Sequence, residues 1–323
     1  MIKMGTAKRS KRIEVYDPDK VKQFNPETKK LLNAYKKDMT LRELSPGTIS
    51  GYMSDLNQWL IYVLEEQDNR SVLELDEDDL TDFFYFCKTE GNNTRRMRRR
   101  YSSISAFYKY LRKKRKVSEN PMEFIDRPVK DTDVTQQTYL TMEQVETMKQ
   151  KLSECGNLTL ECYALFSLST MARVNAVAHI KWKQIDFGHR LVNDVLEKEG
   201  KVVTLFFSEE VGQKLIQLQQ FREWNCVDDG GYVFFSKDKQ GNITSMTTSG
   251  LHGWARRIGR MIGVPTLHPH DFRHSGSQLL KLAGMPLEEI SYFLNHESTE
   301  TTRKHYLQAD TQSMRAAKDK YGI

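Results

Sequence analysis

The sequence predicts a mainly α-helical protein of two domains with one small antiparallel sheet, and three observations lead to this prediction. Apolar residues recur three or four positions apart through most of the chain, which is the spacing of one face of an α-helix. Residues 191–207 differ, because two short runs rich in Val, Leu and Phe flank a turn, as in a β-hairpin. Finally, 323 residues exceed one ordinary core, and the polar stretch 126–138 is typical of a linker.

The first half of the chain is expected to hold a flexible arm and a helical domain. Residues 1–26 are polar and basic with little periodicity, so we predict a flexible basic N-terminal arm. The helical domain should span residues 27–125. Its second helix begins at Ser45-Pro46, its third at an acidic cap at Asp76–Asp79, and its fourth near Thr94, as helix start signals indicate.

The second half should form a mostly helical domain over residues 139–323. Thr141–Gln144 has a capping signature, and the mostly apolar stretch 160–172 indicates a buried helix. After the hairpin, we expect helices over residues 248–262, 270–282, 286–294 and 299–306.

Positive charge is concentrated in one segment. The net charge is only +6, but residues 91–120 hold eleven Lys and Arg against one acidic residue. Such an excess is typical of a polyanion-binding surface. A solubilising face is the alternative, but interleaved tyrosines at positions 101, 108 and 110 favour phosphate contact. The expected DNA contacts are Arg95, Arg96, Arg98, Arg99, Arg100, Lys109, Arg112 and Lys113.

Composition argues against several other classes of protein. The four cysteines are far apart and form no C-x-x-C pair, so we expect neither a zinc site nor a disulfide framework, and a reducing cytoplasm. We see no apolar run of membrane-spanning length and no signal peptide. His268, His270 and His274 suggest a metal cluster, but neighbouring residues do not complete a ligand set. We predict a cytoplasmic, nucleoid-associated protein without a metal or other cofactor.

The last quarter of the chain carries residues suited to phosphate chemistry. His270 and Arg273 lie three positions apart and therefore share a helix face, where both can bind one tetrahedral anion. The phenol of Tyr306 lies downstream and can attack that anion. Alone, a tyrosine near the C-terminus is usually a packing residue, and a histidine and arginine on one helix face usually point to solvent. Together with Arg173 and His296, they favour a phosphate site.

These residues fall in motifs that resemble the tyrosine recombinases, the phage integrase, Xer and Cre-like site-specific DNA recombinases. The resemblance covers the chain from about residue 28 to its end. It also includes Phe107–Leu111 and Glu119–Pro121, which are similar to the last helix and exit of the family's N-terminal core-binding, SAM-like domain. The catalytic motifs follow, with the family's pattern in parentheses where it differs in form: His270-x-x-Arg273-His274, Leu294-Asn295-His296 (Leu-Gly-His), Thr301–Tyr306 (Thr-Thr-x-x-x-Tyr) and Ser169–Val174 (Thr-Gly-x-Arg). A fifth segment, Glu197–Lys201, lies in the hairpin turn where relatives keep a lysine.

The resemblance implies a reaction and a role for each residue. Tyr306 would attack a DNA phosphodiester and form a 3′-phosphotyrosyl link, while Arg173 and Arg273 stabilise the transition state. His270 and His296 would add hydrogen bonds. Lys198 would protonate the leaving 5′-oxygen, with Lys201 as the alternative.

The resemblance also implies partners and leaves alternatives open. Four protomers would assemble on two paired double-stranded DNA sites, with the tail 311–323 docking on a neighbour, to integrate, excise or resolve a mobile element or replicon. A DNA-binding relative without the reaction and a type IB topoisomerase remain alternatives. Asn175-Ala176 replaces the family's common Ser-Glu, so the carboxylate near the first arginine is missing or is supplied elsewhere. Asn295 replaces a glycine.

Overall fold

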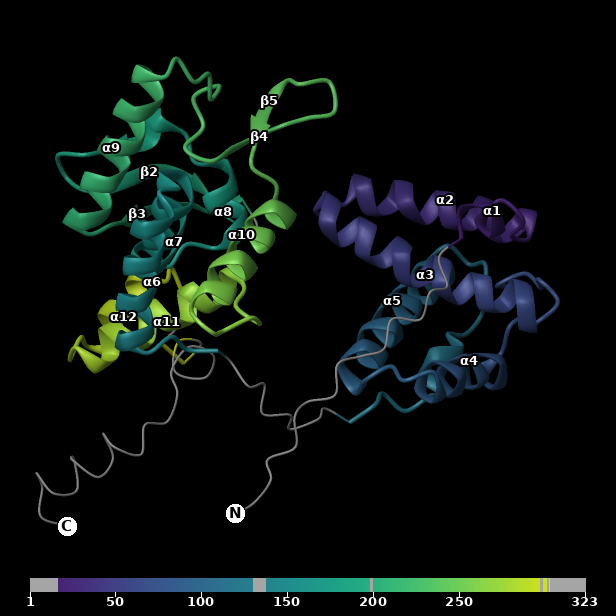
Figure 1. Cartoon of the computed structure of the whole chain (residues 1–323). Coiled ribbons are helices and arrows are strands. Elements are labelled where there is room, and N and C mark those ends of the chain that lie inside the picture. Colours follow the sequence, from purple (N-terminus) through teal and green to yellow (C-terminus); the bar gives the residue numbers. More distant parts are fainter. Residues whose placement is uncertain (1–16, 130–137, 198–199, 297–298, 301, 303–323) are drawn as a thin grey trace, which may run out of the picture. The chain divides into compact units, whose positions relative to one another are not determined.

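Two compact units make up the chain, which divides between Gln136 and Gln137 (Figure 1). The computed structural model describes residues 17–129, 138–197, 200–296, 299–300 and 302. Each unit has a hydrophobic core of its own. None of the described helices is both long and apolar enough to span a bilayer.

The N-terminal unit is a bundle of helices. Its helices are α1 (Pro18–Val21), α2 (Pro26–Leu41), α3 (Pro46–Glu66), α4 (Glu77–Thr89) and α5 (Thr94–Lys113), followed by a 3-10 turn at Pro121–Glu123. Two predicted starts are confirmed by their caps. The Ser45 hydroxyl accepts a hydrogen bond from the Thr48 amide, and Asp76 forms a capping box with Asp79.

The predicted flexible arm is wrong in its last ten residues. Residues 18–21 form α1, and Phe24 is only 2 % exposed within the core of this unit. The Asn25 amide donates to Asn69 Oδ1 over 2.8 Å, which fixes the entry to α2. A single buried aromatic residue has no periodicity, so the sequence pattern did not reveal this packing. Residues 1–16 lie outside the described part of the chain.

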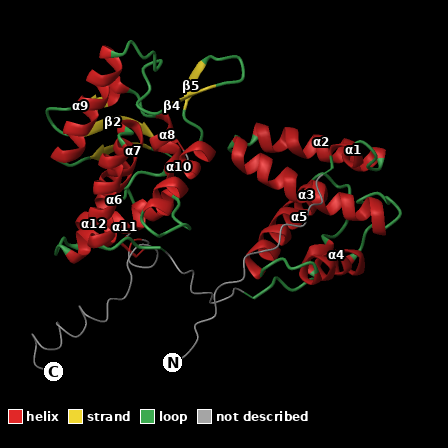
Figure 2. Cartoon of the chain, viewed as in Figure 1, coloured by secondary structure: helices red, strands yellow, loops and turns green. Residues whose placement is uncertain are grey.

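The described part of the C-terminal unit is mostly helical and contains two small sheets. Its helices are α6 (Met142–Cys155), α7 (Leu158–Thr170), α8 (Val174–His179), α9 (Glu209–Trp224), α10 (Thr248–Met261), α11 (Pro269–Leu282) and α12 (Leu287–Phe293). One sheet contains β1 (Ile185–Asp186), β2 (Leu191–Leu196) and β3 (Val202–Phe206) in antiparallel order β1-β2-β3, and the other pairs β4 (Phe235–Lys237) with β5 (Ile243–Ser245). Figure 2 shows that the described strands are confined to this unit.

The predicted hairpin is confirmed as β2 and β3, but α8, α9, β1 and the β4–β5 hairpin were not predicted. α9 does carry the helical spacing Val211, Leu215 and Leu218, all buried. The strands β4 and β5 each contain a single apolar residue among three and are too short for a period-2 signal. In Figure 1 their hairpin projects from the body of the unit.

The buried helix α7 forms the centre of the C-terminal core. Tyr163 contacts the rings of Phe234, Trp254 and Phe272 at centroid distances of 5.5–5.9 Å. The helix was predicted to continue to residue 172, but it ends at Thr170 because Met171 takes a left-handed conformation with φ +53°. α11 crosses nearby, and a Cβ on Gly276 would lie 2.4 Å from the Leu168 carbonyl oxygen. Only glycine therefore permits α11 to pack this closely on the C-terminal end of α7.

Candidate active site

Arg273 joins three separate segments of the C-terminal unit. It lies in α11 and is only 1 % exposed. Its Nη1 donates to the Met171 carbonyl oxygen over 2.6 Å, and its Nη2 donates to the Leu294 carbonyl oxygen over 2.6 Å. Nη2 also lies 3.0 Å from His296 Nε2. The end of α7, the segment after α12 and α11 itself are thus tied together by one guanidinium.

Left-handed backbone conformations help to present the two carbonyl groups. Met171 and Asn295 both have φ +53°, and both stand where the recombinase motifs carry glycine. Asparagine tolerates this region better than most residues. Methionine does not, but the Met171 side chain is buried in a small cluster with Ile290 and Leu294, which offsets the strain. The two positions where the resemblance places a motif glycine thus have a left-handed backbone in this chain.

Arg173 stands at the N-terminal boundary of α8 and forms an ion pair with Glu197, which directly follows β2. The Glu197 side chain is 1 % exposed, whereas 34 % of the Arg173 side chain remains exposed. The sequence left open whether the carboxylate near the first arginine was missing or supplied elsewhere. Glu197 supplies it. Nothing in the sequence marked this residue as the partner of Arg173, because that pairing depends on the fold.

Two histidines lie beside these arginines. His270 keeps an exposed edge, but partial burial, followed by the positive charges of Arg273, His268 and Arg173, lowers its pKa to about 4. Its imidazole is therefore neutral at pH 7. His296 Nδ1 lies 2.8 Å from the Thr302 hydroxyl, so a hydrogen bond on each ring nitrogen fixes its orientation.

Four of the six predicted catalytic residues come together in this way: Arg173, His270, Arg273 and His296. Lys198 and Tyr306 lie outside the described residues, and their roles stay predictions. Lys201, the alternative to Lys198, directs its Nζ to the Asn295 carbonyl oxygen at 3.4 Å.

The basic residues predicted to contact DNA fall into different environments on α5. Arg95, Lys109, Arg112 and Lys113 are exposed, although Arg112 also pairs with Glu123 at 2.9 Å. Arg98 donates to the Pro128 carbonyl oxygen. These five residues remain candidates for phosphate contact, together with Arg96 and Arg99, whose side chains are partly exposed.

Arg96 and Arg99 share a buried carboxylate. Arg96 Nη2 lies 2.9 Å from Asp55 Oδ1, and Arg99 Nε lies 3.0 Å from Asp55 Oδ2. Asp55 is fully buried, while the arginine side chains are 25 % and 50 % exposed. Asp55 therefore fixes two guanidinium groups at the surface of α5. The sequence pattern did not reveal this residue, because a lone aspartate on an amphipathic helix usually faces water.

Arg100 corrects the predicted DNA surface. It is 2 % exposed, and its guanidinium donates to Asn92 Oδ1 over 2.9 Å and to Gln58 Oε1 over 2.7 Å. It also lies over the Phe83 ring, and burial lowers its pKa. Arg100 is thus a core residue of the N-terminal unit and does not face a DNA backbone.

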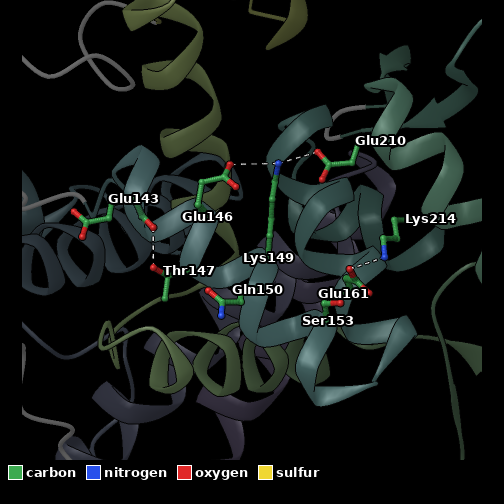
Figure 3. Close-up of a pocket in the computed structure, with 9 residues that line it drawn as sticks. All are labelled: Glu143, Glu146, Thr147, Lys149, Gln150, Ser153, Glu161, Glu210 and Lys214. Carbon is green, nitrogen blue, oxygen red and sulfur yellow. Dashed lines mark hydrogen bonds and ion pairs between the residues drawn. The ribbon is translucent and has the colours of Figure 1, made fainter.

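A separate surface depression of about 750 Å³ lies in the C-terminal unit (Figure 3). Its two ammonium groups are already paired, Lys149 with Glu146 and Glu210, and Lys214 with Glu161. It contains none of the predicted catalytic residues. Within the described part of the chain, no three His, Cys, Asp or Glu side chains are grouped to hold a metal ion.

Comparisons with known proteins cover both units. The profile of the phage integrase family matches residues 138–313, and that of the phage integrase N-terminal SAM-like domain matches residues 32–115. Tyrosine recombinase XerC of Syntrophus aciditrophicus is 25 % identical over 282 residues, which cover 82 % of this chain and 88 % of that protein. XerD of Listeria monocytogenes is 24 % identical over 272 residues, covering 81 % and 88 %.

Solved structures show the same fold at lower identity. The Tn1549 transposon integrase in complex with transposon right end DNA is 20 % identical with a TM-score of 0.67, covering 91 % of this chain and 99 % of that one. A lambda integrase dimer bound to a COC′ core site is 15 % identical with a TM-score of 0.62, covering 85 % and 93 %. The chain therefore belongs to the phage integrase family of tyrosine recombinases, which are DNA strand-transferring enzymes.

Proposed function

We propose that this protein is a site-specific recombinase that cleaves and rejoins double-stranded DNA through a 3′-phosphotyrosyl intermediate on Tyr306. The observation that supports it most is the fixation of Arg273. Because two carbonyl groups and His296 hold its guanidinium, its donors need little reorganisation as negative charge develops on a phosphate.

The proposed reaction exchanges one phosphoester for another. The Tyr306 oxygen attacks the scissile phosphorus, the P–O5′ bond breaks, and the leaving 5′-oxygen takes a proton from Lys198. A 5′-hydroxyl and a 3′-phosphotyrosyl link result, so the bond energy is retained and no nucleotide cofactor is needed. Attack by a 5′-hydroxyl of the exchanged strand reverses these steps and releases Tyr306.

The described residues of the site suit the other catalytic roles, which are stabilising the transition state and accepting the phenol proton. Arg173 and Arg273 would donate to the non-bridging oxygens, where charge builds up in the transition state. His270 is neutral at pH 7, because its pKa is lowered to about 4, and can accept the phenol proton of Tyr306. An approaching phosphate offsets the arginine charges and makes this imidazole more basic.

Duplex DNA is the proposed partner of both units. Structural neighbours are solved on transposon end DNA and on a core site, and α5 presents exposed basic residues suited to phosphate contacts. By analogy with the family, four protomers would act on two paired sites, with residues 311–323 docking on a neighbour. The task would be integration, excision or resolution of a mobile element or replicon.

Trapping on a nicked duplex tests the proposal. A nick beside the scissile phosphate lets a short fragment diffuse away, so a covalent protein–DNA adduct accumulates. We expect an adduct with the native chain and none with Tyr306→Phe. A native chain that binds its site but never forms the adduct would instead be a DNA-binding relative without the reaction.

A second assay separates recombination from topoisomerase activity. A recombinase should exchange strands only between paired sites. Relaxation of supercoiled plasmids without any sequence requirement, and without recombinant products, would contradict the proposal in favour of a type IB topoisomerase.

A further inference from the structure

Glu197 is a buried carboxylate beside a residue proposed to bind the scissile phosphate. Its side chain is 1 % exposed and pairs with Arg173 through Oε2. Its Oε1 is also buried and accepts no hydrogen bond from the part of the chain that the structure describes. A buried carboxylate is unfavourable unless a nearby cation compensates it. Glu197 is therefore held at this place by Arg173.

The same residue opens the turn between β2 and β3. The Glu197 amide donates to the Lys201 carbonyl oxygen over 2.8 Å, which closes the turn, and Lys201 Nζ lies 3.4 Å from the Asn295 carbonyl oxygen. Asn295 precedes His296. The turn is thus connected to Arg173 through Glu197 and to the His296 segment through Lys201.

The ion pair leaves Arg173 able to bind a second anion. A guanidinium has five N–H donors in a planar fork. Glu197 accepts from Nη1, and 34 % of the arginine side chain is exposed. One edge of the fork is therefore fixed by a carboxylate while other donors remain accessible to a phosphate oxygen.

We propose that Glu197 is a positioning residue, which orients Arg173 toward the scissile phosphate and ties the end of β2 to that arginine. This inference rests on the proposed function. Glu197 acts through Arg173 and does not touch DNA itself. A carboxylate does not attract a phosphate, so Glu197 can help only by setting the position of Arg173. Its replacement should therefore change the cleavage rate more than the DNA affinity.

A second ion pair of the same unit provides a matched control. Arg190 and Glu209 flank the β2–β3 hairpin and lie 3.7 Å apart, but their side chains are 52 % and 77 % exposed. An exposed pair of this kind contributes little. Glu209→Gln changes the same chemical group in the same unit without affecting Arg173.

The experiment measures single-turnover adduct formation on the nicked duplex, together with DNA affinity and thermal unfolding of the full chain. We expect Glu197→Gln to slow cleavage by about 10- to 100-fold, the range for misplacing a catalytic group by up to 1 Å. DNA affinity should change by less than about threefold, because no phosphate contact is lost. Glu209→Gln should match the native rate.

A double-mutant cycle separates positioning from a general structural role. If Glu197 acts through Arg173, then Glu197→Gln should have little further effect in an Arg173→Lys background. Should Glu197→Gln fail to fold, Glu197→Asp, which keeps the charge, replaces it in the cycle. Native cleavage by the Glu197 variant, or full additivity with Arg173→Lys, would overturn the inference. Absence of any adduct with the native chain would instead overturn the proposed function.

Discussion

Arg273 in the C-terminal unit and the pair of Arg96 and Arg99 in the N-terminal unit are held by different kinds of partner. In the C-terminal unit, Arg273 donates to two backbone carbonyl groups, and its Nη2 lies 3.0 Å from His296 Nε2. In the N-terminal unit, Arg96 and Arg99 share the single carboxylate of Asp55. The first arrangement fixes one guanidinium through backbone carbonyl groups, whereas the second fixes two guanidinium groups through one shared negative charge.

This difference matches what each unit is proposed to do. A transition state that accumulates negative charge gains most from hydrogen-bond donors that are already fixed in a site shielded from water. Contacts with a DNA backbone need many moderate attractions that counterions can replace. The arrangement around Arg273 suits catalysis, and that around Asp55 suits a binding surface. The predictions below change one arrangement at a time, beginning with the largest expected effect.

Removing Arg273 should have the largest effect on the reaction. Arg273→Ala is expected to slow adduct formation by about 10³-fold, or roughly 4 kcal/mol, because fixed donors at the phosphate are lost. DNA affinity should fall only slightly in a filter-binding or fluorescence assay. Arg273→Lys keeps the charge without the planar fork and should recover only a small part of the rate. Native cleavage by Arg273→Ala would show that this guanidinium is structural.

Neutralising Asp55 should affect stability more than cleavage. Asp55→Asn leaves two guanidinium groups facing each other without their carboxylate, and we expect the free energy of unfolding to fall by about 2 kcal/mol. The effect stays moderate because both arginines reach water. Hydrogen exchange of the α3 and α5 amides in the full chain measures this loss of unfolding free energy within the N-terminal unit. Asp19→Asn removes an exposed partner of Lys22 and should change stability by less than about 0.5 kcal/mol. Equal effects of the two variants would contradict the role given to Asp55.

The exposed residues of α5 should control the salt dependence of DNA binding. Each phosphate contact contributes about 0.9 to the slope of log affinity against log salt. Replacing Arg95 and Lys113 together by alanine should therefore reduce that slope by about 2. Lys149→Ala, which removes a lysine already paired with Glu146 and Glu210, is the control and should leave the slope unchanged. A slope that both variants leave intact would remove α5 from the interface.

The smallest effect concerns the protonation of His270. Its pKa of about 4 in the folded protein lies below the ordinary value of 6.5, so the unfolded chain takes up this proton first on acidification. Its contribution to stability is therefore lost as the pH falls from 6.5 toward 4. NMR titration of the ring should give a midpoint below 5, and Arg273→Ala should move it upward because a nearby positive charge disappears. An unchanged midpoint in that variant would show that Arg273 does not act on this ring.

Local signals in the sequence predicted much of the fold. The caps at Ser45, Asp76 and Thr141 depend on neighbouring residues only, so the sequence reveals them. Phe24 and the β4–β5 hairpin depend on packing with distant segments. They were missed for that reason.

The residues of the candidate site show the same difference between local signals and contacts with distant segments. Arg273 and His270 were found because the helical spacing of their motif predicts a shared face. Glu197 and Asp55 were not found, because each pairs with an arginine that lies more than 20 residues away in sequence. Arg100 was assigned to the DNA surface because a charge run does not reveal which of its members faces the core.

Peptide mapping of the trapped adduct tests the central claim most directly. After nuclease and protease digestion, mass spectrometry should find a 3′-nucleotide phosphate on the peptide that contains Tyr306, and Arg273→Ala should reduce its yield strongly. A phosphate on any other residue, or an undiminished yield without Arg273, would contradict the account.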